Sequence, residues 1–272
     1  MDDKEKITYY GEMIGFLIKK NFFDLWDNMF RVILLNLGFI ASLAIPIFFP
    51  GIIPVPALSV AVFAAGLIWC CIYLAAAALC VKAISDYGAF NFADFWKNLK
   101  AGWPAGLAIS AAGLIIFIMI KIIIPFYLNM NSIIGLLLAA VIFWTLALAL
   151  ISFQFFFAIR ARLDTKLTKI IKKCFIIFFD NPGFAIFTLL YTIVTLILSL
   201  LLAFLLPGPA GILLFLDEAL RLRLLKYDWL EATPDAGVSR KRRIIPWDAL
   251  LIEEREKTGT RSFRSFIFPW KD

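Results

Sequence analysis

Long apolar runs without a charged side chain alternate with short, strongly charged segments along this chain. Four uncharged runs cover residues 32–81, 101–120, 122–159 and 181–216. A transmembrane helix needs roughly 20 consecutive apolar residues, so each run is long enough to cross a bilayer at least once. The pattern predicts an all-α, polytopic membrane protein.

Prolines and glycines divide the longest runs into helical hairpins, because proline cannot sustain the helical hydrogen-bond ladder. Clusters at 46–56, 125–132 and 207–209 predict three turns. An amphipathic segment, 1–28, precedes the transmembrane domain, and a basic tail, 227–272, follows it. We expect that domain, 29–226, to hold about six spans, near residues 30–49, 57–81, 103–124, 133–158, 183–205 and 209–226.

Basic residues are distributed unevenly. Of the 27 Lys and Arg residues, five precede residue 32, three lie in 82–100, six in 160–173 and twelve from 221 onwards, which leaves Lys121 as the exception near a predicted outer turn. Lys and Arg accumulate on the cytoplasmic side of membrane proteins, so both termini are expected in the cytoplasm. That orientation requires an even number of spans; five spans with an external tail are the alternative.

Composition agrees with a membrane protein. Hydrophobic residues make up 62% of the chain and its mean hydropathy is +0.88, which is more apolar surface than a soluble domain hides. We attribute the net charge of +7 to cytoplasmic bias and anionic headgroups and expect no nucleic-acid partner. The acidic start has no cleavable signal-peptide pattern. The four cysteines lack metal-type spacing and are expected to be reduced packing residues.

Three similar aromatic-rich segments, each ending in an asparagine, precede pairs of predicted spans. A proline in the next outer turn follows at a nearly equal distance. The markers are Asn28, Asn98 and Asn181 with Pro56, Pro125 and Pro209. We expect three pseudo-repeated hairpins, each preceded by an interfacial amphipathic helix. The alternative is that aromatic residues and asparagines recur at interfaces by composition alone.

Small residues recur in the third predicted span. Gly102 and Gly106 are four residues apart, and Ser110 and Gly113 follow. Such spacing permits the close approach of another helix, so we expect these residues to serve helix packing.

Few residues are suited to catalysis. The chain contains no histidine, the usual proton shuttle and transition-metal ligand, and no Walker, nucleophile-elbow or dinucleotide motif. We expect a non-enzymatic protein without a cofactor or metal. Asp217 and Arg221, four residues apart on one helix, are predicted to neutralise each other; a substrate or coupling site is the alternative. The candidate intramembrane charges are Asp217, Glu218, Arg221, Arg223 and Lys121.

The tail combines basic and aromatic residues. Its run 240–243 suits anionic lipid, and 246–259 is predicted to be a short helix that begins at proline and ends at glycine. Aromatic side chains beside arginines are typical of protein interfaces and of the bilayer interface. We expect docking, either to a partner or to the chain's own membrane domain, through Pro246, Trp247, Arg261, Arg264, Phe268, Pro269 and Trp270.

Diffuse motifs within 28–226 carry a family resemblance: Asn36, Pro50-Gly51, Pro56-Ala57, Lys82, Phe95-Trp96, Lys100 and Asn181-Pro182. In these residues the chain resembles the YesL-like family of bacterial integral membrane proteins of unknown function. It departs from the family's common Thr-Ile-Gly-Pro-Ala turn, because residues 53–57 read Ile-Pro-Val-Pro-Ala, and the 227–272 tail lies outside the usual pattern. The resemblance implies a context of carbohydrate uptake and degradation and supplies no catalytic residue.

These observations favour a non-enzymatic protein of the bacterial inner membrane. The first hypothesis is an accessory to a carbohydrate ABC-type uptake system that docks to permease or ATPase subunits. The second is a small-solute transporter or channel, although ion coupling is disfavoured by the scarcity of membrane-embedded charge. The third is a membrane-organising protein that interacts with lipid through its amphipathic helices.

Overall fold

The computed structural model describes residues 3–233, 245–259 and 261. Every regular element in this part of the chain is helical. The elements are α1 (Asp3–Asp27), α2 (Met29–Ile52), α3 (Pro56–Ser85), α4 (Phe92–Ile118), the π-helix η1 (Met119–Ile123), α5 (Ile124–Leu128), α6 (Ile133–Phe153), α7 (Phe156–Arg162), α8 (Leu167–Asp180), α9 (Pro182–Leu201), α10 (Gly208–Ala232), α11 (Trp247–Leu250) and α12 (Ile252–Thr258).

Five helical segments are long and apolar enough to cross a membrane. The prediction of a multi-pass helical membrane protein is thereby confirmed. The sixth predicted span, near 209–226, corresponds to α10, which carries too many charges to meet the same criterion. The five are Met29–Ile52, Pro56–Ser85, Ala93–Leu128, Ile133–Arg162 and Pro182–Leu201.

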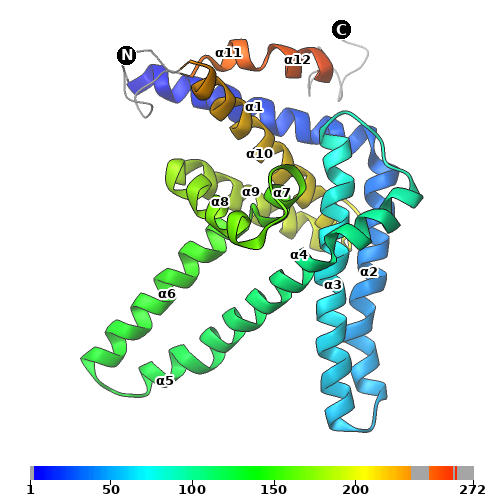
Figure 1. Cartoon of the computed structure of the whole chain (residues 1–272), viewed down its shortest axis with the longest axis vertical. Helices are drawn as coiled ribbons and strands as arrows, with labels where there is room; N and C mark the ends of the chain where they lie inside the picture. Colours follow the sequence, from blue (N-terminus) through cyan, green and yellow to red (C-terminus); the bar gives the residue numbers. More distant parts are fainter. Residues whose placement is uncertain (1–2, 234–244, 260, 262–272) are drawn as a thin grey trace.

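Two long hairpins extend from one end of the molecule and diverge (Figure 1). One is α2–α3; the other consists of α4, η1 and α5 paired with α6. Helix α1 lies across the opposite end, beside α11 and α12, and the shorter helices α7 and α8 lie between it and the second hairpin. We call α1, α7, α8, α10, α11 and α12 the base, because both hairpins extend away from them.

Helix α2 continues further than the sequence predicts. Its two internal prolines, Pro46 and Pro50, were expected to begin the turn, whereas the helix ends only at Ile52. Membrane helices tolerate internal proline. The carbonyl oxygen of Pro50 has no N–H donor four residues on, because residue 54 is also proline, and it accepts a hydrogen bond from the Ser59 hydroxyl at 2.8 Å instead. Pro56 is the first residue of α3, where its missing N–H costs nothing.

Helices α3 and α4 approach each other through glycine, as the small-residue spacing predicts. A Cβ atom at Gly102 would lie 3.1 Å from the Ala75 carbonyl carbon, and one at Gly106 would lie 2.7 Å from the Ile72 nitrogen. Close approach of two backbones replaces the hydrophobic effect as a source of helix association in lipid. At Gly113 nothing lies within 4 Å, so the two helices have already separated there.

The predicted interfacial helix before the second hairpin is not a separate element. Asn91 and Asp94 form a capping box at the start of α4, and the helix then runs through Pro104 to Ile118. The helix continues through Gly102 and Pro104, so the amphipathic stretch runs directly into the apolar one. In the first and third predicted units, α1 and α8 are separate helices.

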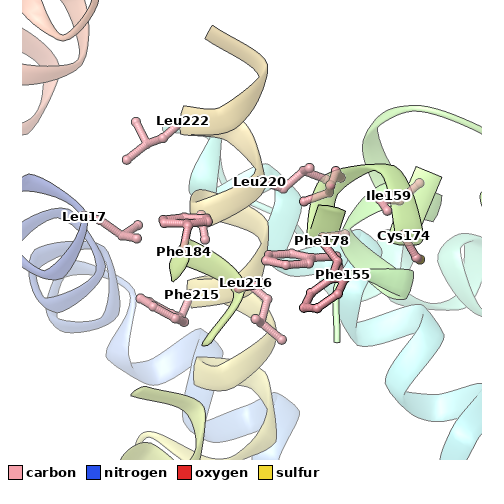
Figure 2. Packing of buried hydrophobic residues seen from close by; sticks show 14 of the residues in the cluster. Leu17, Phe155, Ile159, Cys174, Phe178, Phe184, Phe215, Leu216, Leu220 and Leu222 are labelled. Atoms are coloured by element: carbon pink, nitrogen blue, oxygen red, sulfur yellow. The ribbon is translucent and has the colours of Figure 1, made fainter. Parts of the chain in front are cut away.

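Helix α10 is the most enclosed long helix. Its residues Phe215, Leu216, Leu220 and Leu222 form the centre of a core that also contains Leu17 from α1 and Phe155, Ile159, Cys174, Phe178 and Phe184 from the neighbouring helices (Figure 2). The five candidate spans expose many large apolar side chains, whereas α10 faces protein on most sides. It is the axis of the base.

The turn between α9 and α10 is fastened by Asn36 of α2. The Asn36 amide donates to the carbonyl oxygens of Leu205 at 3.0 Å and Pro207 at 2.8 Å, and its oxygen accepts from the Ala210 N–H at 2.9 Å. Buried backbone groups away from water need such partners. Gly208 has φ +62° and a Cβ there would collide with the Asn36 amide, so glycine is required at this position.

We predict opposite effects of alanine at Gly106 and Gly113. Gly106→Ala forces α3 and α4 apart, and overpacking of this kind typically costs about 1–3 kcal/mol. Gly113→Ala meets nothing and gains the roughly 0.5–1 kcal/mol by which alanine exceeds glycine inside a helix. Thermal unfolding of the detergent-solubilised variants measures the difference. Equal or greater stability of the Gly106 variant would disprove the close α3–α4 contact.

Candidate functional site

Charged side chains from five separate segments converge within the base. We call them the charge cluster: Lys20 and Asp24 from α1, Asp86 after α3, Arg162 from α7, Asp217, Glu218 and Arg221 from α10, and Glu254 from α12. Asp217 and Arg221 share one face of α10 and Glu218 lies on another, since successive helical residues are about 100° apart. Helix α10 therefore presents charges to α7 on one side and to α1 on the other.

Asp217 is paired with Arg162, not with Arg221. The Arg162 Nε lies 2.9 Å from Asp217 Oδ1 and its Nη2 2.5 Å from Oδ2. The same guanidinium donates to Asp86 Oδ1 at 2.9 Å and to the Ser85 hydroxyl at 2.8 Å. The predicted pair of Asp217 with Arg221 is wrong because a bidentate guanidinium from another helix matches a buried carboxylate better than a neighbour on the same helix does.

Arg221 instead binds Glu254 of α12 and so holds the described part of the tail against α10. Its Nη2 lies 2.6 Å from Glu254 Oε1 on α12, and its Nη1 lies 2.6 Å from Asp86 Oδ1 and 2.7 Å from the Ser85 carbonyl oxygen. The Tyr87 hydroxyl donates to the other Glu254 oxygen at 2.7 Å. Burial raises the pKa of Tyr87 to about 12, so its hydroxyl keeps the proton that this hydrogen bond needs.

Lys20 connects α1 to the cluster. Its side chain is fully buried; Nζ lies 2.5 Å from Asp24 Oδ2, 3.2 Å from the Ser85 carbonyl oxygen and 3.8 Å from Glu218 Oε1. The ring of Tyr87 lies 4.0 Å away on another side. Burial lowers the pKa of Lys20, but Glu218 and Asp24 outweigh it and the net shift is upward. The ammonium is therefore charged.

Arg223 and Lys121, the other predicted intramembrane cations, lie apart from the charge cluster. The Arg223 guanidinium lies 3.7 Å from the centre of the Phe184 ring and 3.3 Å from Asn181 Oδ1. It is fully buried, so it does not extend to the interface as a snorkelling side chain would. Lys121 is exposed in η1 on the second hairpin.

The described part of the tail packs on the chain's own helices. Trp247 is buried in the core with Leu251, and Arg261 forms two hydrogen bonds to Asp27, at 2.9 and 2.8 Å. The predicted helix between Pro246 and Gly259 is split into α11 and α12. The remaining docking candidates, Arg264, Phe268, Pro269 and Trp270, lie outside the described residues.

The repeat markers occupy related but unequal positions. Pro56, Pro125 and Pro209 each begin a helix, as its first or second residue. Asn28 and Asn181 separate two helices, whereas Asn98 lies within α4 and donates to Cys80 Sγ at 3.3 Å. The prolines thus share a local role, and the asparagines do not.

Most members of the charge cluster were not identified from the sequence. Arg162 and Lys20 counted only toward the charge asymmetry, and Asp86 and Glu254 were not singled out. Lys20 and Asp24 do have the four-residue spacing of a helical ion pair, which was a usable signal. The other pairings join positions 33 to 198 residues apart, and no local pattern indicates them.

The cluster can fasten helices together, but it does not saturate Glu218, whose two buried carboxylate oxygens have no hydrogen-bond partner in the described part of the chain and face Lys20 Nζ only at 3.8 Å. Each of its five carboxylates lies within 4 Å of Lys20, Arg162 or Arg221. Among the described residues, no group of three or more His, Cys, Asp or Glu side chains could hold a metal ion. The remaining carboxylates have protein cations as close partners, which suits them to positioning helices.

We predict that Asp217 is energetically coupled to Arg162 more strongly than to Arg221. Removing one partner of a buried ion pair costs about 3–5 kcal/mol because the other charge stays buried, so Asp217→Ala together with Arg162→Ala should recover part of the loss. Two double-mutant cycles of thermal unfolding, 217 with 162 and 217 with 221, measure this. Arg255→Ala is the control, since its pair with Asp248 is exposed and worth about 0–1 kcal/mol. A larger coupling to Arg221 would contradict the geometry.

No family model, curated protein or solved structure matches this chain. Its function therefore has to be inferred from its own contacts, charges and exposed faces.

Proposed function

We propose that this chain is a non-enzymatic assembly protein of the bacterial inner membrane, accessory to a carbohydrate ABC-type uptake system. In this proposal the base holds two hairpins in a fixed, divergent arrangement, and the second hairpin docks to a membrane subunit of the transporter. The class of partner comes from the resemblance to the YesL-like family. The docking face comes from the exposure of the second hairpin.

The uncovered second hairpin is the observation that carries the proposal. None of the most apolar stretch of Ala93–Leu128 is buried within the chain, compared with 33% of that in Pro56–Ser85. Large side chains are open on both arms, with exposed fractions of 60% for Leu114 and 65% for Trp144. A hairpin that leaves its own bundle (Figure 1) offers two helices to a neighbouring membrane protein.

The base supplies the rigidity that such docking needs. Arg160 of α7 donates to the Ala101 carbonyl oxygen of α4 at 2.9 Å, and Gln154, at the end of α6, donates to the Ala185 carbonyl oxygen of α9 at 2.9 Å. The α4 arm of the second hairpin is therefore attached to α7 of the base, and the α6 arm to the neighbouring helix α9. Preorganisation of this kind reduces the entropy lost on association.

We further infer that the three hairpins, α2–α3, α4–α6 and α9–α10, all enter the membrane from the cytoplasmic side, with both termini in the cytoplasm. The cation asymmetry supports this orientation. The third hairpin enters the membrane less deeply than the other two. Its turn is hydrogen-bonded to Asn36, which lies seven residues after Met29, the first residue of α2. Seven helical residues correspond to roughly 10 Å along the helix. Helix α10, which corresponds to the sixth predicted span, then returns to the cytoplasmic side without crossing the whole bilayer.

Site-specific photo-crosslinking tests the docking face. A photoreactive residue at Leu114 or Trp144 is expected to capture a permease or ATPase subunit of a carbohydrate uptake system in native membranes, identified by mass spectrometry. Val60, on the first hairpin and 67% exposed, is the matched control and should not capture it. Capture of a second copy of this chain alone, capture of lipid alone, or equal capture from Val60 would each overturn the proposal.

A further inference from the structure

Helix α8 lies between candidate spans on the surface of the base. It contacts α6, α7 and α9 and buries Ile170, Cys174, Ile177 and Phe178 against them. Its N-terminus follows α7 and its C-terminus leads directly into α9. Because apolar helices continue from both of its ends, α8 is placed where a bilayer's headgroups meet its acyl chains.

The outward side of α8 begins with a group of lysines. Lys166, Lys169 and Lys172 are exposed, and none of them forms an ion pair with a described carboxylate, since the nearby Asp164 is paired with Lys173 at 3.2 Å. Asp180, at the other end of the helix, is paired with Lys226 at 2.8 Å. The acidic side chains beside α8 are thus paired within the chain. Lys169 is attracted to Asp164 without forming an ion pair with it, so the exposed lysines can still face an external anion.

An apolar groove follows the lysines on the same face. Lys172, Phe175, Ile176 and Phe179 have the i, i+3, i+4, i+7 spacing of a single helical face, and with Asp180 they line a shallow, open groove on the surface of this one helix. Phe179 is 67% exposed and Ile176 49%. A cation at one end of an exposed aromatic groove matches a molecule with an anionic head and an apolar chain.

We infer that α8 is a binding site for one anionic phospholipid. Its phosphate is held by Lys169 and Lys172, and an acyl chain covers Phe175, Ile176 and Phe179. The charges are complementary, and the helix lies at the depth where headgroups and chains meet. The bias of lysine toward the cytoplasmic side explains why cations are present; it does not explain an exposed phenylalanine and isoleucine directly beside them. This site is independent of the proposed docking of the second hairpin.

The test uses the purified full-length chain in neutral detergent, titrated with phosphatidylglycerol or phosphatidylcholine and followed by native mass spectrometry. Lys169→Gln with Lys172→Gln is expected to weaken phosphatidylglycerol binding by roughly 30-fold, from the contribution typical of two lysines near an anionic surface. Lys97→Gln with Lys100→Gln removes the same charge from α4 and should leave binding unchanged. Phe179→Ser should weaken binding while the lysines remain.

Three results would overturn the inference: full phosphatidylglycerol binding by the Lys169 and Lys172 variant, an equal loss in the Lys97 and Lys100 variant, or equal affinity of the wild-type chain for phosphatidylcholine. Glycerol phosphate, added as the free headgroup, distinguishes lipid from a soluble phosphate compound. It should not displace the lipid, because it has no chain for the groove; complete displacement would also contradict a lipid site. Circular dichroism confirms that each variant is folded.

Discussion

The rest of the structure depends on neutralising the charges that α10 carries into the interior. An unpaired ionised side chain in an apolar environment costs several kcal/mol, so Asp217 and Glu218 require cations close by. Arg162 of α7 pairs closely with Asp217, and Lys20 of α1 lies 3.8 Å from Glu218, whose oxygens have no hydrogen-bond partner among the described residues. Arg221 in turn holds Glu254 of α12. One helix thereby fixes the relative positions of α1, α7 and the tail.

This constraint also positions the membrane-facing parts. Because α10 is held in the base, the turn that precedes it contacts α2 near the start of that helix, at Asn36. The side-chain amide of Asn36 satisfies three backbone groups there, the carbonyl oxygens of Leu205 and Pro207 and the N–H of Ala210. The first hairpin is joined to α10 there, and the second is joined to α7 and α9 at its roots. The two hairpins also contact each other directly where Gly102 and Gly106 of α4 meet α3. Beyond that contact they diverge (Figure 1) and expose the faces proposed for a partner.

Properties set by local composition could be predicted, and properties set by distant contacts could not. Hydropathy identified the five apolar helices, and glycine spacing identified the α3–α4 contact. The pair of Asp217 with Arg221 failed because helical neighbours were considered before α7, 55 residues away. Pro46 and Pro50 did not end α2, since a membrane helix tolerates proline when other groups replace its hydrogen bonds. Asn36 was noticed only as part of a resemblance, although a buried amide in an apolar helix calls for a polar partner.

The depth of the α9–α10 turn is the most direct test of this account. Single cysteines at Val55, Met130 and Ala203, in the three hairpin turns, can be probed in intact cells with a membrane-impermeant thiol reagent against the background of the native cysteines. If the start of α2 faces the cytoplasm, as we propose, the turn lies about 10 Å from that side, and we expect labelling at positions 55 and 130 and none at 203. Labelling at 203 equal to that at 55 would place the turn at the outer surface and contradict the proposed shallow position of the α9–α10 hairpin.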